Sequence, residues 1–314
     1  MYTKKWECIH RRFTIFMGIN SLKSEEKWNM SEHKEGKLYL CATPIGNLED
    51  ITLRVLRTLQ EVDLIGAEDT RHTIKLLNHF QIKTPMTSYH EYNKVDKAKY
   101  LVGLMKEGKN IALVTDAGTP AISDPGEELV RQCFEAGVTV TSLPGPAACI
   151  TALTMSGIAT RRFAFEAFLP TDKKEHKQVL DELKNESRTI IIYEAPHRLL
   201  RTLKELAQVF GGDRKMTVCR ELTKHYEEAS QGTIDEKIAF YESEEPKGEY
   251  VLVIEGKTFE QKAVEKQEEF AQMTILEHLD SYLAKGMDKK EAMKLVAKER
   301  GVSKRDIYQA DLLR

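Results

Sequence analysis

VTDAGTPAISDPG, residues 114–126, stands between two stretches with clear secondary-structure patterns. It begins at the end of the short apolar run Ile111–Val114, which turn residues flank and which predicts a buried strand. After it, Glu127–Ala136 repeats apolar residues at helical spacing. A strand, a long rigid loop and a helix form the unit with which an open α/β sheet presents a ligand at the carboxyl ends of its strands. We therefore expect an α/β fold with a ligand site on this loop.

The residue types in this loop suit some ligands better than others. Gly118 allows a bulky group to approach the backbone closely, and Pro120 and Pro125 stiffen the loop because each fixes φ. Asp116 and Asp124 are a poor choice for holding phosphate, since like charges repel. They suit a ribose hydroxyl, an amino group or a cationic ligand. The alternative is a Pro- and Gly-rich connector in which Asp124 only caps the next helix.

Further strings on either side of this loop occur in an order typical of a known family. They are LYLCATPIGNLEDIT from Leu38, AEDTRHT from Ala67, TSLPGPAA from Thr141, YEAPHR from Tyr193, CRELTKHYEE from Cys219 and GEYVLVIEG from Gly248. Together with GTPAISDPG they resemble the bacterial 16S rRNA cytidine-2′-O-methyltransferases, a branch of the tetrapyrrole (precorrin) methylase superfamily. The strings span roughly residues 37–256. The resemblance implies S-adenosylmethionine as methyl donor, a cytidine 2′-hydroxyl of 16S rRNA in the small ribosomal subunit as acceptor, and a homodimer.

The resemblance also predicts which residues bind the donor. The first loop, at the end of the expected strand Leu38–Ala42, borders the cleft in this family, and the third, after Val138–Leu143, lines the adenosine pocket. The predicted donor-binding residues are Pro44 and Ile45 in the first loop; Asp116, Ala117, Gly118, Thr119, Pro120, Ser123 and Asp124 in the central loop; and Pro144, Gly145, Pro146 and Ala147 in the third. The alternatives are an ordinary turn at the first loop and, at the third, a helix start that needs small residues for packing, with Pro146 in its first turn.

A 2′-hydroxyl is a weak nucleophile and gains from a nearby general base. Glu68, His197 and Lys224, if the pKa of Lys224 is lowered, are the candidates, and the sequence does not rank them. Glu68 could instead belong to a surface ion pair and helix cap, and His197 could be an ordinary polar residue in the first turn of a helix. For contact with RNA phosphates, the predicted residues are Arg71, Arg220, Lys224, Lys304 and Arg305.

The chain divides into five segments by composition and pattern. Residues 1–36 are predicted to be a disordered tail or an incorrectly assigned start, and residues 37–146 and 147–257 are two α/β domains. The charged stretch 258–272 reads as a linker, and 273–314 predicts three short helices. Within the last segment ERGVSKRDIYQ has the spacing of a helix-turn-helix, with Ser303 as a cap. The alternative is a helical cap that only buries surface.

Bulk properties limit the possible functions. The 314 residues carry 47 Lys and Arg against 49 Asp and Glu, a net charge of −2, so any contact with nucleic acid must be local. The five cysteines include no CxxC pair, which argues against a zinc site or a disulfide framework and fits the cytoplasm. No apolar run has the length of a membrane span, and the mechanism requires no metal.

Two other function classes stay open at this stage. A precorrin-type methylase would share the donor cleft but would methylate a tetrapyrrole carbon, and the TPIGN, EDTR and RELTK strings argue against it. A non-enzymatic RNA-binding protein could carry a degenerate methylase fold, although the complete donor loop argues against that. Neither domain contains GxGxxG, which disfavours a Rossmann-type methyltransferase.

Overall fold

The computed structural model describes residues 35–258, 260–262, 267, 270 and 272–313. The predicted N-terminal extension lies outside these residues apart from its last two. Glu35 forms an ion pair with Lys106 at 2.9 Å, and the Gly36 amide donates to the Met105 carbonyl at 2.8 Å. Residues 35 and 36 are therefore held by hydrogen bonds to the helix that ends at Lys106.

The first sheet has five strands in the order β3-β2-β4-β1-β5, and all neighbouring strands are parallel. The strands are β1 (Lys37–Cys41), β2 (Leu64–Ala67), β3 (Met86–Ser88), β4 (Ile111–Val114) and β5 (Thr139–Leu143). All four residues of β4 are buried, as expected for a central parallel strand covered on both faces. The loops that follow β4, β1 and β5 consequently leave the sheet side by side at its carboxyl edge.

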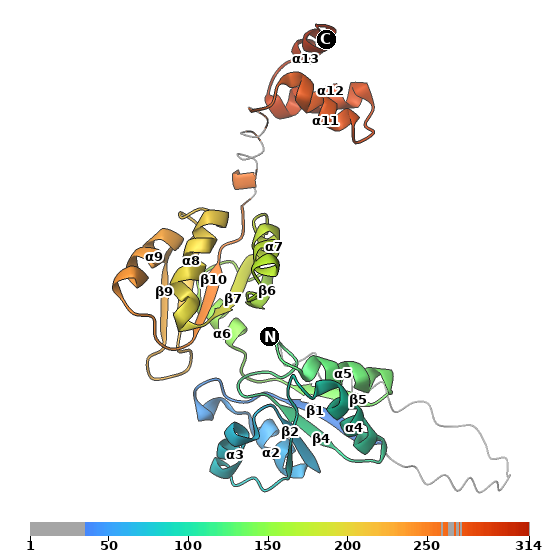
Figure 1. Ribbon diagram of the computed structural model, residues 1–314, viewed down its shortest axis with the longest axis vertical. Coiled ribbons are helices and arrows are strands. Elements are labelled where there is room, and N and C mark those ends of the chain that lie inside the picture. The colour runs from blue at the N-terminus through green and yellow to red at the C-terminus, as the bar shows by residue number, and fades with distance from the viewer. Residues whose placement is uncertain (1–34, 259, 263–266, 268–269, 271, 314) are drawn as a thin grey trace, which may run out of the picture. The chain divides into compact units, whose positions relative to one another are not determined.

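Helices cover both faces of this sheet (Figure 1). They are α2 (Leu53–Glu61) and α3 (Thr70–His79) on one face, and α4 (Lys94–Lys106) and α5 (Gly126–Glu135) on the other. The alternation of β1 explains this arrangement, because Leu38 and Leu40 belong to the core under α4 and α5 while Cys41 belongs to the core under α2 and α3.

The second sheet is mixed, in the order β6-β7-β10-β8-β9. Its strands are β6 (Phe163–Phe168), β7 (Thr189–Glu194), β8 (Lys215–Arg220), β9 (Glu228–Thr233) and β10 (Tyr250–Ile254). Only β6 and β7 pair in parallel, whereas β10 runs antiparallel between β7 and β8. One face packs against α7 (Lys173–Leu183), α8 (Pro196–Phe210) and α9 (Ile234–Ser243), and the other against α6 (Ala148–Met155). The predicted α/β fold with two sheets is confirmed.

The C-terminal segment consists of α11 (Ile275–Leu283), α12 (Lys289–Arg300) and α13 (Lys304–Leu312) around a small core that includes Leu279, Val296 and Ile307. Gly301 ends α12 with φ at +65°, and Ser303 and Asp306 form a reciprocal capping box at the start of α13. The predicted three helices and the Ser303 cap are therefore confirmed.

Several boundaries differ from the sequence prediction for local reasons. The Thr52 hydroxyl accepts a hydrogen bond from the Val55 amide, so α2 begins at Leu53, after a short 3-10 turn, η1 (Leu48–Asp50). Pro146 does not lie in the first turn of α6, because the extended Ala147 is the N-cap residue. The short edge strand β3 carried no apolar alternation that would have predicted it. None of the helices in the described part of the chain is long and apolar enough to span a membrane.

Candidate functional site

Hydrogen bonds tie together the three loops at the carboxyl edge of the first sheet. The Thr43 amide donates to the Gly118 carbonyl at 2.9 Å, and the Gly118 amide donates back to the Thr43 carbonyl at 3.0 Å. The Thr119 hydroxyl donates to the Pro146 carbonyl at 2.8 Å. The first two bonds join the ends of the neighbouring strands β4 and β1, and the third joins the loops that follow β4 and β5, which flank β1 on either side. The segments around residues 43–46, 115–126 and 144–147 therefore form one connected rim.

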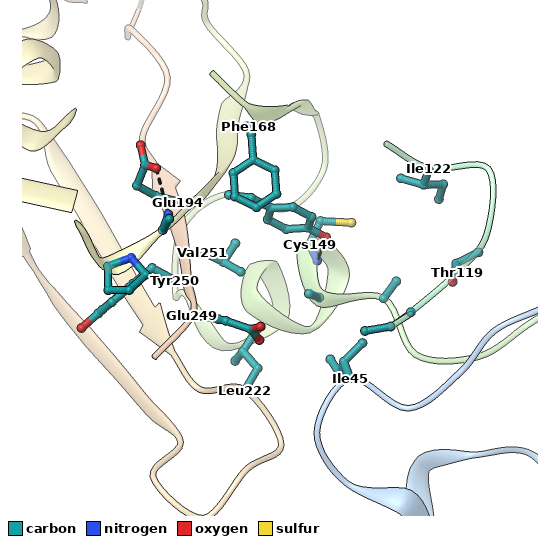
Figure 2. A pocket seen from close by; sticks show the side chains of 17 residues that line it. Ile45, Thr119, Ile122, Cys149, Phe168, Glu194, Leu222, Glu249, Tyr250 and Val251 are labelled. Carbon is teal, nitrogen blue, oxygen red and sulfur yellow. Dashed lines mark hydrogen bonds between the residues drawn. The ribbon is translucent and has the colours of Figure 1, made fainter. Parts of the chain in front are cut away.

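This rim forms one wall of a cavity of about 390 Å³, and the second sheet forms the opposite wall (Figure 2). From the first wall the cavity is lined by Ile45, Ala117, Gly118, Thr119, Ile122 and Ala147, and from α6 by Ala148 and Cys149. The second sheet and its loops contribute Phe168, Tyr193, Glu194, Ala195, Pro196, Leu222, Glu249, Tyr250 and Val251. The volume lies within the range of about 300–1,000 Å³ that is usual for small-molecule sites.

The walls are mainly apolar, with a few polar groups in defined positions. Glu194 is buried, and its carboxylate accepts hydrogen bonds from the Thr202 hydroxyl at 2.5 Å and from the Ala195 amide at 2.8 Å. The Tyr193 hydroxyl accepts from the Cys149 amide at 3.0 Å and so connects β7 to the start of α6. An apolar cavity with a small number of fixed polar groups is the usual form of a site for a small organic ligand.

Backbone strain is concentrated beside the lining residues. Ala121 and Ser123 flank Ile122, Ala167 precedes Phe168, and Glu221 and Thr223 flank Leu222; all five of these neighbours have positive φ. In the described part of the chain, Gln81 is the only other non-glycine residue with a positive φ. Such conformations cost on the order of 1–3 kcal/mol each and cluster at functional sites. The strain therefore points to this cavity independently of its shape.

The predicted donor-binding residues separate into two groups. Ile45, Ala117, Gly118, Thr119 and Ala147 line the cavity, whereas Pro44, Asp116, Pro120, Ser123, Asp124, Pro144, Gly145 and Pro146 do not. Pro44 and Asp116 line a second, separate cavity. Gly145 packs against Ala42, where a Cβ would lie 2.6 Å from the Ala42 Cβ, so packing explains this glycine. The structure therefore brings five of the predicted residues, which come from all three predicted loops, together around one cavity.

Asp124 has a role inside the loop itself. Its carboxylate accepts hydrogen bonds from the amides of Ala121 at 3.0 Å, Ile122 at 3.3 Å and Gly126 at 2.7 Å. These bonds occupy both carboxylate oxygens and hold the strained turn in place. Asp124 is not the N-cap residue of α5, which is Pro125, although it accepts from the amide of the first helical residue, Gly126. Asp124 acts as a support for Ile122.

The three candidate bases occupy different environments. Partial burial acts to lower the pKa of Lys224, but hydrogen bonds to Glu221 and Glu249, both at 2.9 Å, outweigh it and raise that pKa. The lowered pKa on which a role for Lys224 as a base depends is therefore absent, and its ammonium is a fixed cation. His197 is exposed and outside the cavity lining. Glu68, at the end of β2, accepts a hydrogen bond from the Thr115 hydroxyl at 2.7 Å.

The candidate RNA contacts lie on three separate parts of the chain. Arg71 is highly exposed and forms a two-point pair with Asp69, whose pKa the hydrogen bonds from Arg71 lower to about 2. The Arg220 side chain donates to the Lys247 carbonyl at 2.8 Å and so supports a loop. Lys304 and Arg305 are exposed in the first turn of α13.

Sequence reasoning missed the whole second wall of the cavity. Phe168, Leu222 and Val251 were not predicted as site residues, although two of them lie in strings that had been noted, CRELTKHYEE and GEYVLVIEG. Those strings follow or form strands of the second sheet, and this position was the available signal. Among the described residues no group of three or more His, Cys, Asp or Glu side chains is arranged to hold a metal ion.

A family profile and several relatives of known name match this chain over most of its length. The family profile of the tetrapyrrole (corrin/porphyrin) methylases matches residues 37–238. The chain is 50% identical over 277 residues to a Synechocystis protein, covering 88% of this chain and 98% of that one. It is 49% identical over 276 residues to one from Bacillus subtilis, covering 88% and 94%. A Thermotoga maritima protein is 47% identical over 222 residues, covering 71% of this chain and 99% of its own. All three are named ribosomal RNA small subunit methyltransferase I.

Solved structures share the fold at low sequence identity. A diphthine synthase aligns with a TM-score of 0.57 and 14% identity, covering 71% of this chain and 91% of that one. The uroporphyrin-III-C-methyltransferase of Thermus thermophilus aligns with a TM-score of 0.50 and 19% identity, covering 69% and 94%. These two likenesses show the fold alone.

Proposed function

The chain belongs to the tetrapyrrole methylase family, and from this premise we propose that it transfers a methyl group from S-adenosylmethionine to the 2′-hydroxyl of a cytidine in small-subunit ribosomal RNA. The names of relatives at 50% and 49% identity support methylation of ribosomal RNA. The choice of a ribose hydroxyl rests on the sequence strings quoted above. The observation that carries the proposal is the apolar cavity whose rim is built from the family's loops.

The cavity fits the proposed donor in size and in the character of its walls. Gly118, with φ at +86°, leaves the rim open where a side chain would stand, and the apolar faces of Ile45, Phe168 and Val251 suit a flat heterocycle. The Tyr193 ring at the cavity wall offers favourable surroundings for positive charge. S-adenosylmethionine held there supplies an activated methyl group, so the protein's main task is to align the acceptor oxygen. Such alignment can contribute ~7–11 kcal/mol.

Glu68 is the candidate that best suits the role of general base in this proposal. It lies at the carboxyl end of β2, next to β4, and the Thr115 hydroxyl orients its carboxylate. Lys224 is held as a cation by two carboxylates. Neither Glu68 nor His197 lines the first cavity, but the hydrogen-bond partner of Glu68, Thr115, lines the second cavity at the same sheet edge, whereas His197 is exposed in the first turn of α8. A carboxylate at this edge can accept the proton that a ribose hydroxyl loses as it attacks the methyl group.

Glu68→Gln should retain the hydrogen bond from Thr115 while removing the basic oxygen. We expect kcat to fall by on the order of 10²–10⁴-fold, with the affinity for S-adenosylhomocysteine unchanged in calorimetry. Glu61→Gln, which changes an exposed carboxylate at the end of α2, is the matched control and should behave like the unmodified protein. An active Glu68→Gln variant would remove Glu68 from the role of base.

Transfer of a labelled methyl group tests the function itself. The purified protein is incubated with methyl-labelled S-adenosylmethionine and, in separate reactions, small ribosomal subunits, naked 16S rRNA and a reduced tetrapyrrole. We expect label in the RNA, recovered after alkali treatment in an uncleaved dinucleotide because a 2′-O-methyl group blocks cleavage. Label in single nucleotides would indicate base methylation and contradict the ribose assignment. Label only in the tetrapyrrole, or in none of the acceptors, would overturn the proposal.

A further inference from the structure

A second cavity, of about 280 Å³, lies at the same edge of the first sheet. It is bounded by the segment that follows β1, by the end of β4 and by α3. Its lining residues are Thr43, Pro44, Leu48, His72, Thr73, Lys75, Leu76, His79, Thr115 and Asp116. The volume is close to the lower end of small-molecule sites, about 300 Å³, and suits a single nucleotide unit.

The two cavities share a wall. Thr43 and Pro44 line the second cavity while Ile45 lines the first, and Thr115 and Asp116 line the second while the residues that follow them line the first. The backbone bridge between Thr43 and Gly118 joins these two segments. A ligand in the second cavity would therefore lie next to a ligand in the first, with only these two loop segments between them.

The α3 side of the second cavity is lined by hydrogen-bond donors and potential cations. His72, Lys75 and His79 are spaced i, i+3 and i+7, so they lie on one face of the helix. None of the three has a carboxylate partner among the described residues, whereas Lys106 and Lys109, which precede β4 at the other end of the sheet, are paired with Glu35 and Asp63. Unpaired imidazole and ammonium groups on one face are suited to bind a phosphate.

The end of β4 contributes hydrogen-bond acceptors to the cavity. Asp116 is exposed, and one of its oxygens accepts from the Asp69 amide at 3.1 Å, which fixes the carboxylate at the cavity wall. The Thr115 hydroxyl bonds to Glu68 at 2.7 Å on the same side. Carboxylate oxygens are suited to bind hydroxyl groups and repel phosphates. The cavity thus combines basic donors from α3 with a carboxylate from the end of β4, and these groups suit the phosphate and a hydroxyl of one ribose-phosphate unit.

We propose that this second cavity binds a ribose-phosphate unit of the acceptor RNA and so holds the RNA chain beside the donor. The inference rests on the proposed function, and it names the place where the acceptor backbone enters. His72, Lys75 and His79 contact the phosphate, and Asp116 contacts a ribose hydroxyl. These are binding and positioning contacts, distinct from the proton transfer assigned to Glu68.

The test compares two sets of variants in the full-length protein. His72→Ala/Lys75→Ala/His79→Ala removes the donors on the cavity face, and Asn78→Ala/Lys83→Ala changes exposed residues that lie outside the cavity lining. Methyl transfer to small ribosomal subunits gives KM and kcat, and calorimetry with S-adenosylhomocysteine reports on the first cavity. Lys75→Ala and Lys75→Arg are added as single variants, in case the triple variant does not fold. Cytidine 5′-monophosphate serves as a free-nucleotide probe.

We expect the triple variant to raise KM for the subunits at least tenfold, with the donor-cavity affinity within twofold of the unmodified protein. The control pair should stay within twofold on both measures. Lys75→Ala should raise KM several-fold, and Lys75→Arg should restore it because the cation is kept. Unchanged KM in folded Lys75→Ala or triple variants would overturn the inference. So would loss of cytidine 5′-monophosphate binding without any change in KM, which would assign the cavity to a free nucleotide. If the unmodified protein methylates no RNA, the proposed function itself fails.

Discussion

Gly118 combines two constraints that act on the same residue. Its φ of +86° lies in the region that side chains rarely adopt, and a Cβ would stand 3.4 Å from the Ile45 Cγ2 at the cavity wall. Gly137 also has a positive φ, +73°, yet a Cβ there would meet no atom within 4 Å. Substitutions at Gly118 and Gly137 therefore separate the cost of backbone strain, which both positions share, from the effect of a side chain on the cavity, which only Gly118 can have.

Gly118→Val should destabilise the fold by about 1–3 kcal/mol through strain and lower the affinity for S-adenosylhomocysteine at least tenfold, because the side chain enters the cavity rim. Gly137→Val should show a similar loss of stability with unchanged affinity. Urea unfolding and calorimetry on the folded proteins provide the two measurements. Equal affinities in the two variants would contradict a donor site at Gly118.

Lys224 links the cavity to the pH dependence of stability. Although burial acts to raise the pKa of Glu221, hydrogen bonds that include the one from Lys224 lower it overall from 4.5. A carboxyl group whose pKa is lowered by folding stabilises the protein above its unfolded pKa, and this contribution is lost as the pH falls through the lowered folded value. The effect of removing Lys224 should therefore depend on pH.

Lys224→Met should cost about 1 kcal/mol at pH 7, and the difference from the unmodified protein should shrink as the pH falls below about 4. Lys204→Met removes an ion pair with Glu242 in which both side chains are about half exposed, and it should have little effect at either pH. Urea unfolding at the two pH values measures both variants. A difference that is constant with pH would show that Lys224 acts only through packing.

At the scale of elements, one side chain joins β7 to α6. The Tyr193 hydroxyl accepts from the Cys149 amide at the start of α6, and the ring packs edge-on against Phe165 and Phe168, with centroids 4.9 and 5.6 Å away. The first amides of a helix have no partner within the helix, so α6 depends on an outside acceptor here. Since α6 carries Ala148 and Cys149 into the cavity, this bond also fixes part of the site.

Tyr193→Phe should keep the ring contacts and leave the Cys149 amide without an acceptor. We expect a loss of about 1–3 kcal/mol and a modest fall in affinity for S-adenosylhomocysteine. Tyr92→Phe is the control, because Tyr92 is 97% exposed and should tolerate the change. Thermal unfolding and calorimetry make the comparison, and an unaltered melting temperature would mean that the amide finds another partner.

At the scale of the whole molecule, charge is distributed unevenly. The chain is nearly neutral, yet Lys290, Lys294 and Lys298 are exposed at intervals of four along α12, and Lys304 and Arg305 follow at the start of α13. Local basic clusters are what phosphate contacts require, and such contacts weaken with salt.

Deletion of residues 273–314 should leave the affinity for S-adenosylhomocysteine unchanged, because every residue that lines the proposed donor cavity precedes this segment. RNA affinity should fall, with a shallower dependence on salt. Exchange of Lys290, Lys294 and Lys298 for Glu keeps the helices and should reproduce the loss. Filter binding of 16S rRNA at several salt concentrations measures both proteins. Full RNA affinity in the folded deletion protein would make the segment only a structural cap.

The sequence by itself determined the local parts of this protein. Capping residues such as Thr52 and Ser303 set helix starts, because a cap acts within three residues of itself. The buried run Ile111–Val114 formed a strand with the predicted boundaries. The family's loops were found from their residues, and five of the predicted lining positions surround one cavity because parallel strands end at a common edge.

Only the tertiary structure decided the rest, because it depends on pairings between distant residues. The insertion of β10 between β7 and β8 could not be predicted, since a continuous apolar run such as Tyr250–Ile254 is compatible with any central position in a sheet. That insertion supplies Tyr250 and Val251 to the cavity and brings Glu249 to the ammonium of Lys224, where its hydrogen bond, together with the one from Lys224 to Glu221, raises the pKa of Lys224. Local patterns set the backbone of each segment, whereas the far wall of the site arises from contacts that close only when the second sheet forms.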